Sequence, residues 1–235
     1  MKDIYWIKYI GLTIFLITLV SINSCLILSQ SFDFNNSPFA IGDAIADKSS
    51  DWIIPYLDGN NSISRVVRVF PNTLIFKPSM LAVGILLIFY WIKNKNLILE
   101  LDENQLHTKK IIIFGILSAI CLIFHALVLG TELDNGVIKK IRRIILLLFI
   151  IFEVVAQAYL LIIFYKIKNK ILNLISIKFL FFKRCLVTTL IITIIISAPF
   201  VSMPGNTAFK HILEWNYFLA VVFFYLLTFF MWKKI

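Results

Sequence analysis

Six segments of this chain are each long and apolar enough to cross a lipid bilayer. A spanning helix needs about 20 mostly apolar residues, and a helix can cross lipid because it satisfies its own backbone hydrogen bonds. With 60% hydrophobic and 15% charged residues, the chain has more apolar surface than a soluble globular protein needs. The pattern predicts an all-α integral membrane protein, a single bundle of six transmembrane helices. The expected spans cover residues 4–28, 74–92, 111–130, 144–165, 185–203 and 216–232.

The distribution of Lys and Arg between the connecting segments indicates the orientation of the chain. If the N-terminus is cytoplasmic, the inner segments carry 14 of these residues and the outer loops carry 9. Cytoplasmic loops are enriched in Lys and Arg, so both termini are expected inside. The richness in Lys, Asn and Ile favours a bacterial protein of the inner membrane. The KKIRR cluster at 139–143 then lies outside, which either contradicts this topology or marks a site that requires positive charge.

The longest connection joins the first two spans. This outer loop, residues 29–73, is rich in Asp, Asn and Ser, and long unstructured loops are uncommon unless they are functional. Asp58-Gly59 follows Pro55, a combination that favours a tight turn, so the loop is expected to be ordered and to cover the ends of the helices. The basic segment 166–184 predicts either an amphipathic helix on the inner leaflet or ordinary positive-inside charge.

Glu153 lies near the centre of the fourth expected span. A charge at the bilayer centre costs about 2.5–3.5 kcal/mol on insertion scales, so this side chain is expected to face protein or a water-filled cavity. Gln157 shares its helix face, four residues further on. Ser118 and His125 lie on one face of the third span, and a contact between His125 and Glu153 is feasible. The alternative is that these polar residues only fix the packing of the helices.

Charged residues gather on the outer side under this topology. Arg binds phosphate through two parallel hydrogen bonds, so the outer set predicts a site for a zwitterionic or anionic lipid head group. The alternative is an ordinary solvated loop surface. His211 and Glu214 lie three residues apart at the start of the last span. The residues expected to bind the head group are Asp58, Arg65, Arg68, Glu132, Lys139, Lys140, Arg142 and Arg143.

Several motifs of well-known enzyme classes are missing from the sequence. It contains no HExxH, no Walker A loop, no GxSxG and no GxGxxG, so no cofactor is expected. Three histidines, separated by 18 and 86 residues, do not predict a compact metal site. The net charge of +10 comes from residues that flank apolar segments, which favours loops at a membrane over binding to nucleic acid.

Three stretches resemble parts of the Frag/DRAM/Sfk superfamily of six-span membrane proteins. Residues 51–80 resemble its first outer loop, and IFEVVAQAYLL at 151–161 resembles its middle span with an acidic residue. HILEWNYFLAVVFFYLLTFFMW at 211–232 resembles the acidic-Trp start of its final span, with Glu214 and Trp215 matching. At 57–59, Leu-Asp-Gly replaces the usual Ser-Asp-x-Gly order. The resemblance implies a multi-pass protein that deals with lipids, without implying a particular reaction.

Three functional hypotheses follow from these features. In the first, the protein recognises or organises a membrane lipid through an outer-facing polar pocket. In the second, it is a lipid-modifying enzyme whose acid–base pair is Glu153 with His125, or Glu214 with His211. In the third, it is a structural or assembly subunit that packs within the membrane against a protein partner or a second copy of itself, through a face of small residues.

Overall fold

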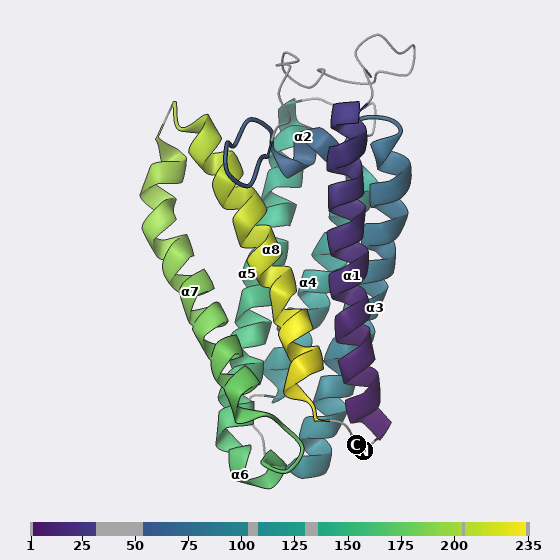
Figure 1. The fold of residues 1–235 in the computed structure, drawn as a ribbon, viewed down its shortest axis with the longest axis vertical. Coiled ribbons are helices and arrows are strands. Elements are labelled where there is room, and N and C mark those ends of the chain that lie inside the picture. The colour runs from purple at the N-terminus through teal and green to yellow at the C-terminus, as the bar shows by residue number, and fades with distance from the viewer. Residues whose placement is uncertain (1, 32–53, 103–107, 130–135, 204, 234–235) are drawn as a thin grey trace.

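The computed structural model describes residues 2–31, 54–102, 108–129, 136–203 and 205–233, and these form a bundle of long helices (Figure 1). Two short helices, α2 (Ile63–Val67) and α6 (Lys168–Ile171), accompany them. The long helices are α1 (Lys2–Ser31), α3 (Asn72–Leu101), α4 (Thr108–Val128), α5 (Gly136–Lys166), α7 (Ile177–Ser202) and α8 (Thr207–Met231). Each of these six contains an apolar stretch long enough to cross a bilayer. The predicted all-α bundle of six spans is therefore confirmed.

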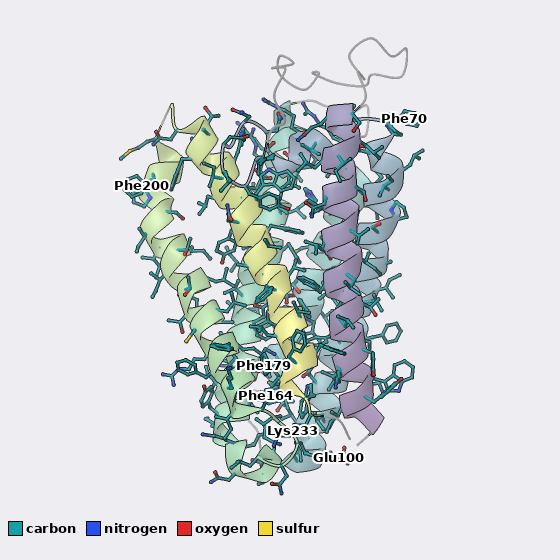
Figure 2. The ribbon with its side chains drawn as sticks, viewed as in Figure 1. Phe70, Glu100, Phe164, Phe179, Phe200 and Lys233 are labelled. Atoms are coloured by element: carbon teal, nitrogen blue, oxygen red, sulfur yellow. The ribbon has the colours of Figure 1, made fainter. Side chains whose placement is uncertain are left out.

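The six long helices form a closed ring. α1 packs against α3, α3 against α4, and α4 against α5. α5 then packs against α7, α7 against α8, and α8 against α1. Both termini and α6 lie at one end of the bundle, and α2 lies at the other (Figure 1). Figure 2 places Phe70 and Phe200 at the α2 end, and Glu100 and Lys233 at the opposite end, here called the terminal end. The Lys and Arg bias predicts that the terminal end faces the cytoplasm.

Several spans extend well beyond the segments that hydropathy predicted. α3 continues nine residues past residue 92, and α7 begins eight residues before residue 185. A helix ends where its hydrogen bonding ends and not where its apolar residues end. In α3 the last such bond joins the Asp102 N–H to the Ile98 carbonyl. As a result, Tyr90 and Trp91 lie inside the helix and are fully buried in the bundle.

Only part of the long connection between the first two spans is described. Residues 32–53 lie outside the described residues, and residues 54–71, here called the cover segment, pack at the α2 end. The predicted turn is present, because the Asp58 carboxylate accepts the backbone N–H groups of Ile54 (2.7 Å) and Asn60 (2.9 Å). Ser62 then begins α2 by accepting the N–H of Arg65 at 3.2 Å, as N-cap residues do.

The basic segment 166–184 does not form the amphipathic surface helix that was one of its two predicted structures. It contains the four-residue helix α6, a turn, and the first turns of α7. Ile171 and Ile175 are buried, and Ile175 forms an isolated antiparallel bridge with Trp232 after α8. The alternation of Lys with apolar residues therefore reflects a segment folded back against the bundle.

Asn72 joins three elements at the α2 end. The nitrogen of its side-chain amide lies within hydrogen-bond distance of the Cys25 carbonyl (3.0 Å), the Ser29 hydroxyl (2.5 Å) and the Val66 carbonyl (2.8 Å), so its two N–H groups are shared among three acceptors. Asn72 is fully buried, so water does not compete for these hydrogen bonds. One side chain thereby ties α1 and α2 to the start of α3.

Candidate functional site

Glu153 is the centre of a buried polar cluster. Its carboxylate accepts hydrogen bonds from the Ser118 hydroxyl (2.6 Å), the Gln157 amide (3.0 Å) and the Tyr225 hydroxyl. Glu153, Ser118 and Gln157 are fully buried, and Tyr225 is nearly so. The partners come from α4, α5 and α8. Glu153 therefore faces the interior of the bundle, where donors compensate the loss of water around its carboxylate.

The contact between His125 and Glu153 that the sequence made feasible is not found among the described residues. His125 interacts instead with the backbone of Arg142. Ser118, which does reach Glu153, lies seven residues from His125, or about 10 Å along the helix. The prediction placed Glu153 about nine residues into a helix starting at residue 144, but α5 begins at Gly136. Glu153 is consequently deeper in the bundle than His125.

Lys183 is a second buried ionisable residue, and the sequence reasoning missed it. It lies in α7 with none of its surface exposed. Its ammonium group donates to the Thr228 hydroxyl at 2.8 Å and lies 3.7 Å from the centre of the Phe224 ring. A cation over an aromatic face is attracted by the ring quadrupole. Two contacts from α8 therefore hold this ammonium group inside the bundle.

Two tyrosines bring the Glu153 and Lys183 clusters together. The Tyr90 and Tyr225 rings pack edge to face with their centres 5.0 Å apart. Tyr225 binds Glu153, while the Tyr90 hydroxyl lies 3.1 Å from the Thr228 hydroxyl that receives Lys183. Polar side chains thus run from Glu153 to Lys183 across α5, α8, α3 and α7. The three-residue spacing of Tyr225 and Thr228 on one helix face is the sequence signal that points to this arrangement.

A small cavity lies directly against Glu153. Its volume is about 20 Å³, and its wall is apolar except for Glu153, Tyr225 and Thr18. Thr18, on α1, is 2% exposed, and its hydroxyl has no hydrogen-bond partner among the described residues. The surface that these residues present to the cavity is apolar.

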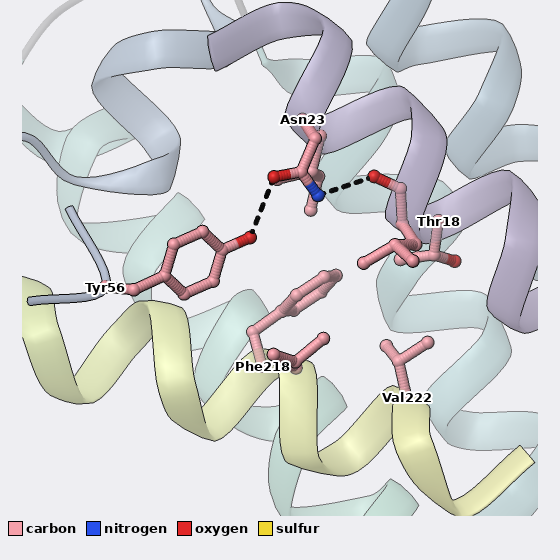
Figure 3. Close-up of a pocket in the computed structure, with 8 residues that line it drawn as sticks. Thr18, Asn23, Tyr56, Phe218 and Val222 are labelled. Atoms are coloured by element: carbon pink, nitrogen blue, oxygen red, sulfur yellow. Dashed lines mark hydrogen bonds between the residues drawn. The ribbon is translucent and has the colours of Figure 1, made fainter. Parts of the chain in front are cut away.

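A second cavity, of about 10 Å³, lies between α1, α8 and the cover segment (Figure 3). Its wall includes Thr18, Phe218 and Val222, which also line the cavity at Glu153. At its other side the Tyr56 hydroxyl donates to the Asn23 side-chain carbonyl at 3.2 Å. The two cavities are thus neighbours that share one wall.

The first turns of α8 hold the cover segment. The His211 ring nitrogen Nδ1 lies 2.7 Å from the Gly59 carbonyl oxygen, within hydrogen-bond distance. The Trp215 indole N–H donates to the Asn61 carbonyl at 2.7 Å. His211, a candidate for acid–base chemistry, therefore makes a structural contact.

Glu214 also binds the cover segment. Its carboxylate accepts hydrogen bonds from the backbone N–H groups of Ile63 and Ser64, where a helix N-terminus favours negative charge. Arg143, exposed on α5, interacts with it electrostatically. Among the described contacts of Glu214 and His211 there is no hydrogen bond between the two, so the predicted pair is not assembled as an acid–base couple.

Gly59 allows the cover segment to approach α8 closely, and this leads to a prediction. Its φ is +66°, and an added Cβ would lie 2.1 Å from the Ala208 carbonyl oxygen. We expect Gly59→Ala to lower the free energy of unfolding by roughly 1–3 kcal/mol, because overpacking adds to backbone strain. Thermal unfolding in detergent measures the loss. Gly205→Ala is the control, since Gly205 has φ +90° but open space around its Cβ. An equal loss in both variants would show that the approach to Ala208 is unimportant.

The residues expected to bind a head group are only partly brought together. Lys140 and Arg143 are exposed near the start of α5, and Arg142 is half-buried beside His125. They lie at the α2 end, where Arg143 and Glu214 interact. This leaves exposed positive charge next to the first turns of α8.

The other residues that were expected to bind a head group lie in the cover segment or outside the described residues. Asp58 is used by the turn of the cover segment, and Arg65 and Arg68 are half-buried in and just after α2. Glu132 and the side chain of Lys139 lie outside the described residues. Among the described residues that were expected to bind a head group, the exposed cations are therefore Lys140 and Arg143, at the start of α5.

The resemblance to the Frag/DRAM/Sfk superfamily rests on the three stretches quoted above alone. Comparison of the chain with models of protein families, with curated proteins and with solved structures finds no match.

Proposed function

We propose that this multi-pass membrane protein recognises a membrane lipid with an anionic or zwitterionic head group at its α2 end, alongside α5 and α7. The observation that carries the proposal is the position of two exposed cations, Lys140 and Arg143, beside an exposed apolar wall. Such cations bind phosphate through charge-assisted hydrogen bonds, and the acyl chains of a lipid pack against such an apolar wall.

The apolar wall includes the half of α7 nearest the α2 end. Its exposed isoleucines cover more than half of the circumference of the helix, because successive residues turn by about 100°. Only 22% of the apolar window of α7 is buried, against 39–44% in the other five spans. In Figure 1 this half of α7 leans away from α5. The exposed isoleucines are Ile191, Ile192, Ile194, Ile195 and Ile196.

α5 supplies an apolar face and the positive charge together. Ile141, Ile144 and Leu147 are 43%, 56% and 56% exposed, and their three-residue spacing places them along one side of the helix. Lys140 and Arg143 belong to the same turns. A lipid whose phosphate lies at Arg143 would extend its chains along this face toward the middle of the bundle.

The proposal predicts weaker lipid binding in the double variant Lys140→Ala/Arg143→Ala. Each cation near an anionic surface contributes about 1 kcal/mol, so we expect a loss of about 2 kcal/mol, or roughly 30-fold in affinity. Binding of phosphatidylglycerol and phosphatidylcholine to the protein in detergent, followed by native mass spectrometry, measures the effect. Lys109→Ala/Lys166→Ala is the matched control, because both lysines are exposed at the terminal end. The same loss in both double variants would contradict a site at α5.

The exposure of α7 also supports a second candidate function, a subunit that packs against another chain in the membrane. Thr189, Thr193 and Ser197 recur at a spacing of four, as in faces where helices approach closely. Ser197, however, is buried and donates to the Ile194 carbonyl within α7. A second chain that co-purifies in defined stoichiometry and is displaced by bulky substitutions at Ile195 would favour this function over lipid recognition.

A further inference from the structure

Arg184 of α7 lies against Tyr165 of α5 near the terminal end. The central carbon of its guanidinium group is 5.4 Å from the centre of the Tyr165 ring, within the range of a cation–π interaction. Arg184 is exposed and Tyr165 is half-buried. Among the described residues, neither the guanidinium group nor the Tyr165 hydroxyl has a hydrogen-bond or ion-pair partner. The ring therefore positions a cation whose N–H donors remain available to a ligand.

The position of Tyr165 along α5 places this cation at the level of lipid head groups. Arg143 and Tyr165 belong to the same helix and are 22 residues apart, which is about 33 Å of helix. The hydrocarbon core of a bilayer is about 30 Å thick. A bilayer with the head groups of one leaflet at Arg143 therefore has those of the other leaflet at Tyr165 and Arg184. Figure 2 agrees with this level, because Phe164, the neighbour of Tyr165, lies near the terminal end.

Exposed apolar surface leads from Arg184 toward the middle of the bundle. Ile162 is 46% exposed, and it lies three residues before Tyr165, on the same side of α5. On α7, Thr188 and Ile191 follow Arg184 by four and seven residues and are exposed, and this spacing places them on the helix face of Arg184. The two helices thus present hydrogen-bond donors at the head-group level and an apolar surface beneath them, as a phospholipid requires.

We propose that Arg184 binds the phosphate of an anionic phospholipid in the leaflet at the terminal end, with the acyl chains along Ile162 and the exposed face of α7. A guanidinium group donates two parallel hydrogen bonds to a phosphate, and the Tyr165 hydroxyl is a further donor beside it. Lys178, exposed on α7, adds positive charge that favours an anionic head group. This site goes beyond the lipid site proposed at the start of α5, because it uses other cations and faces the opposite leaflet.

Native mass spectrometry of the full chain in detergent, titrated with phosphatidylglycerol, tests the proposal by counting bound lipids. Arg184→Ala should weaken the binding of one lipid roughly tenfold, the scale of a hydrogen bond to a charged group. Arg184→Lys keeps the charge but loses the paired donors, so it should recover only part of this affinity. Lys140→Ala/Arg143→Ala should keep this lipid and lose the one at the α2 end. If the α2-end site does not exist, a single lipid binds, and Arg184→Ala still weakens it.

Lys110→Ala is the matched control, because Lys110 is also exposed and lies 5.4 Å from the centre of the Tyr159 ring. Its ammonium group lacks the paired donors of a guanidinium group, so lipid binding should be unchanged. Glycerol 3-phosphate, which has the phosphate without acyl chains, should not displace the lipid at equal concentration. The proposal is overturned if Arg184→Ala binds phosphatidylglycerol as the unmodified protein does, if Lys110→Ala loses as much affinity, or if glycerol 3-phosphate displaces the lipid.

Discussion

Replacing Asn72 by Asp is expected to lower the free energy of unfolding by about 3–5 kcal/mol, the range for an uncompensated buried charge. The two N–H groups of the Asn72 amide are shared among three acceptors, on Cys25, Ser29 and Val66. A carboxylate at this fully buried position would face two carbonyl oxygens and donate nothing. The junction of α1, α2 and α3 would separate, and thermal or chemical unfolding in detergent would show the loss.

The pH dependence of this variant provides an internal check. Burial disfavours the charged form of the new carboxyl group, so its pKa in the folded state is raised above that in the unfolded state. The folded state then binds more protons, and stability rises as the pH is lowered through the folded-state pKa. Asn216→Asp is the control, because Asn216 also donates to two carbonyl groups but is exposed. A comparable loss in the control would refute the argument from burial.

Glu153→Leu is the second substitution from which a large effect is expected. It leaves the Tyr225 hydroxyl without its acceptor, and a buried group without a partner costs about 1–3 kcal/mol. Ser118 and Gln157 lose the same acceptor but keep the Gly115 and Val221 carbonyls. Glu153→Gln keeps an acceptor oxygen of similar reach and should cost about 1 kcal/mol. Thermal stability and expression of the two variants measure the difference. If Leu proves as stable as Gln, the donors have found other partners and the cluster is not an anchor of the bundle.

Hydropathy predicted the fold class and the number of spans because each apolar segment must be a helix in lipid. It also placed Glu153 correctly, since an isolated charge in lipid is costly. Hydropathy could not reveal Lys183, because this residue follows the apolar run FLFF and precedes Arg184, in a stretch that resembles a basic loop. Whether such a lysine is buried depends on how far the helix continues, which backbone hydrogen bonding decides.

The pairing of side chains was harder to predict than the spans. The register of α4 against α5 depends on where α5 begins. A start at residue 144 predicted an offset of about 6 Å between His125 and Glu153, whereas α5 begins at Gly136 and Glu153 contacts Ser118. His211 and Glu214 have the chemistry of an acid–base pair, yet both bind the backbone of the cover segment. Those contacts join residues about 150 positions apart in the chain, and no local pattern encodes them.

α8 reaches both the Glu153 cluster and the cover segment. Tyr225 binds Glu153, while His211 and Trp215 bind the cover segment. Fourteen residues separate His211 from Tyr225, which is about 21 Å of helix, and a helix is stiff along its axis. A sliding of α8 by 1–2 Å, the usual scale of helix shifts, would therefore displace the cover segment by a similar distance. Through α8, a change in the hydrogen bonding of Glu153 in the middle of the bundle can therefore change the position of the cover segment at the α2 end.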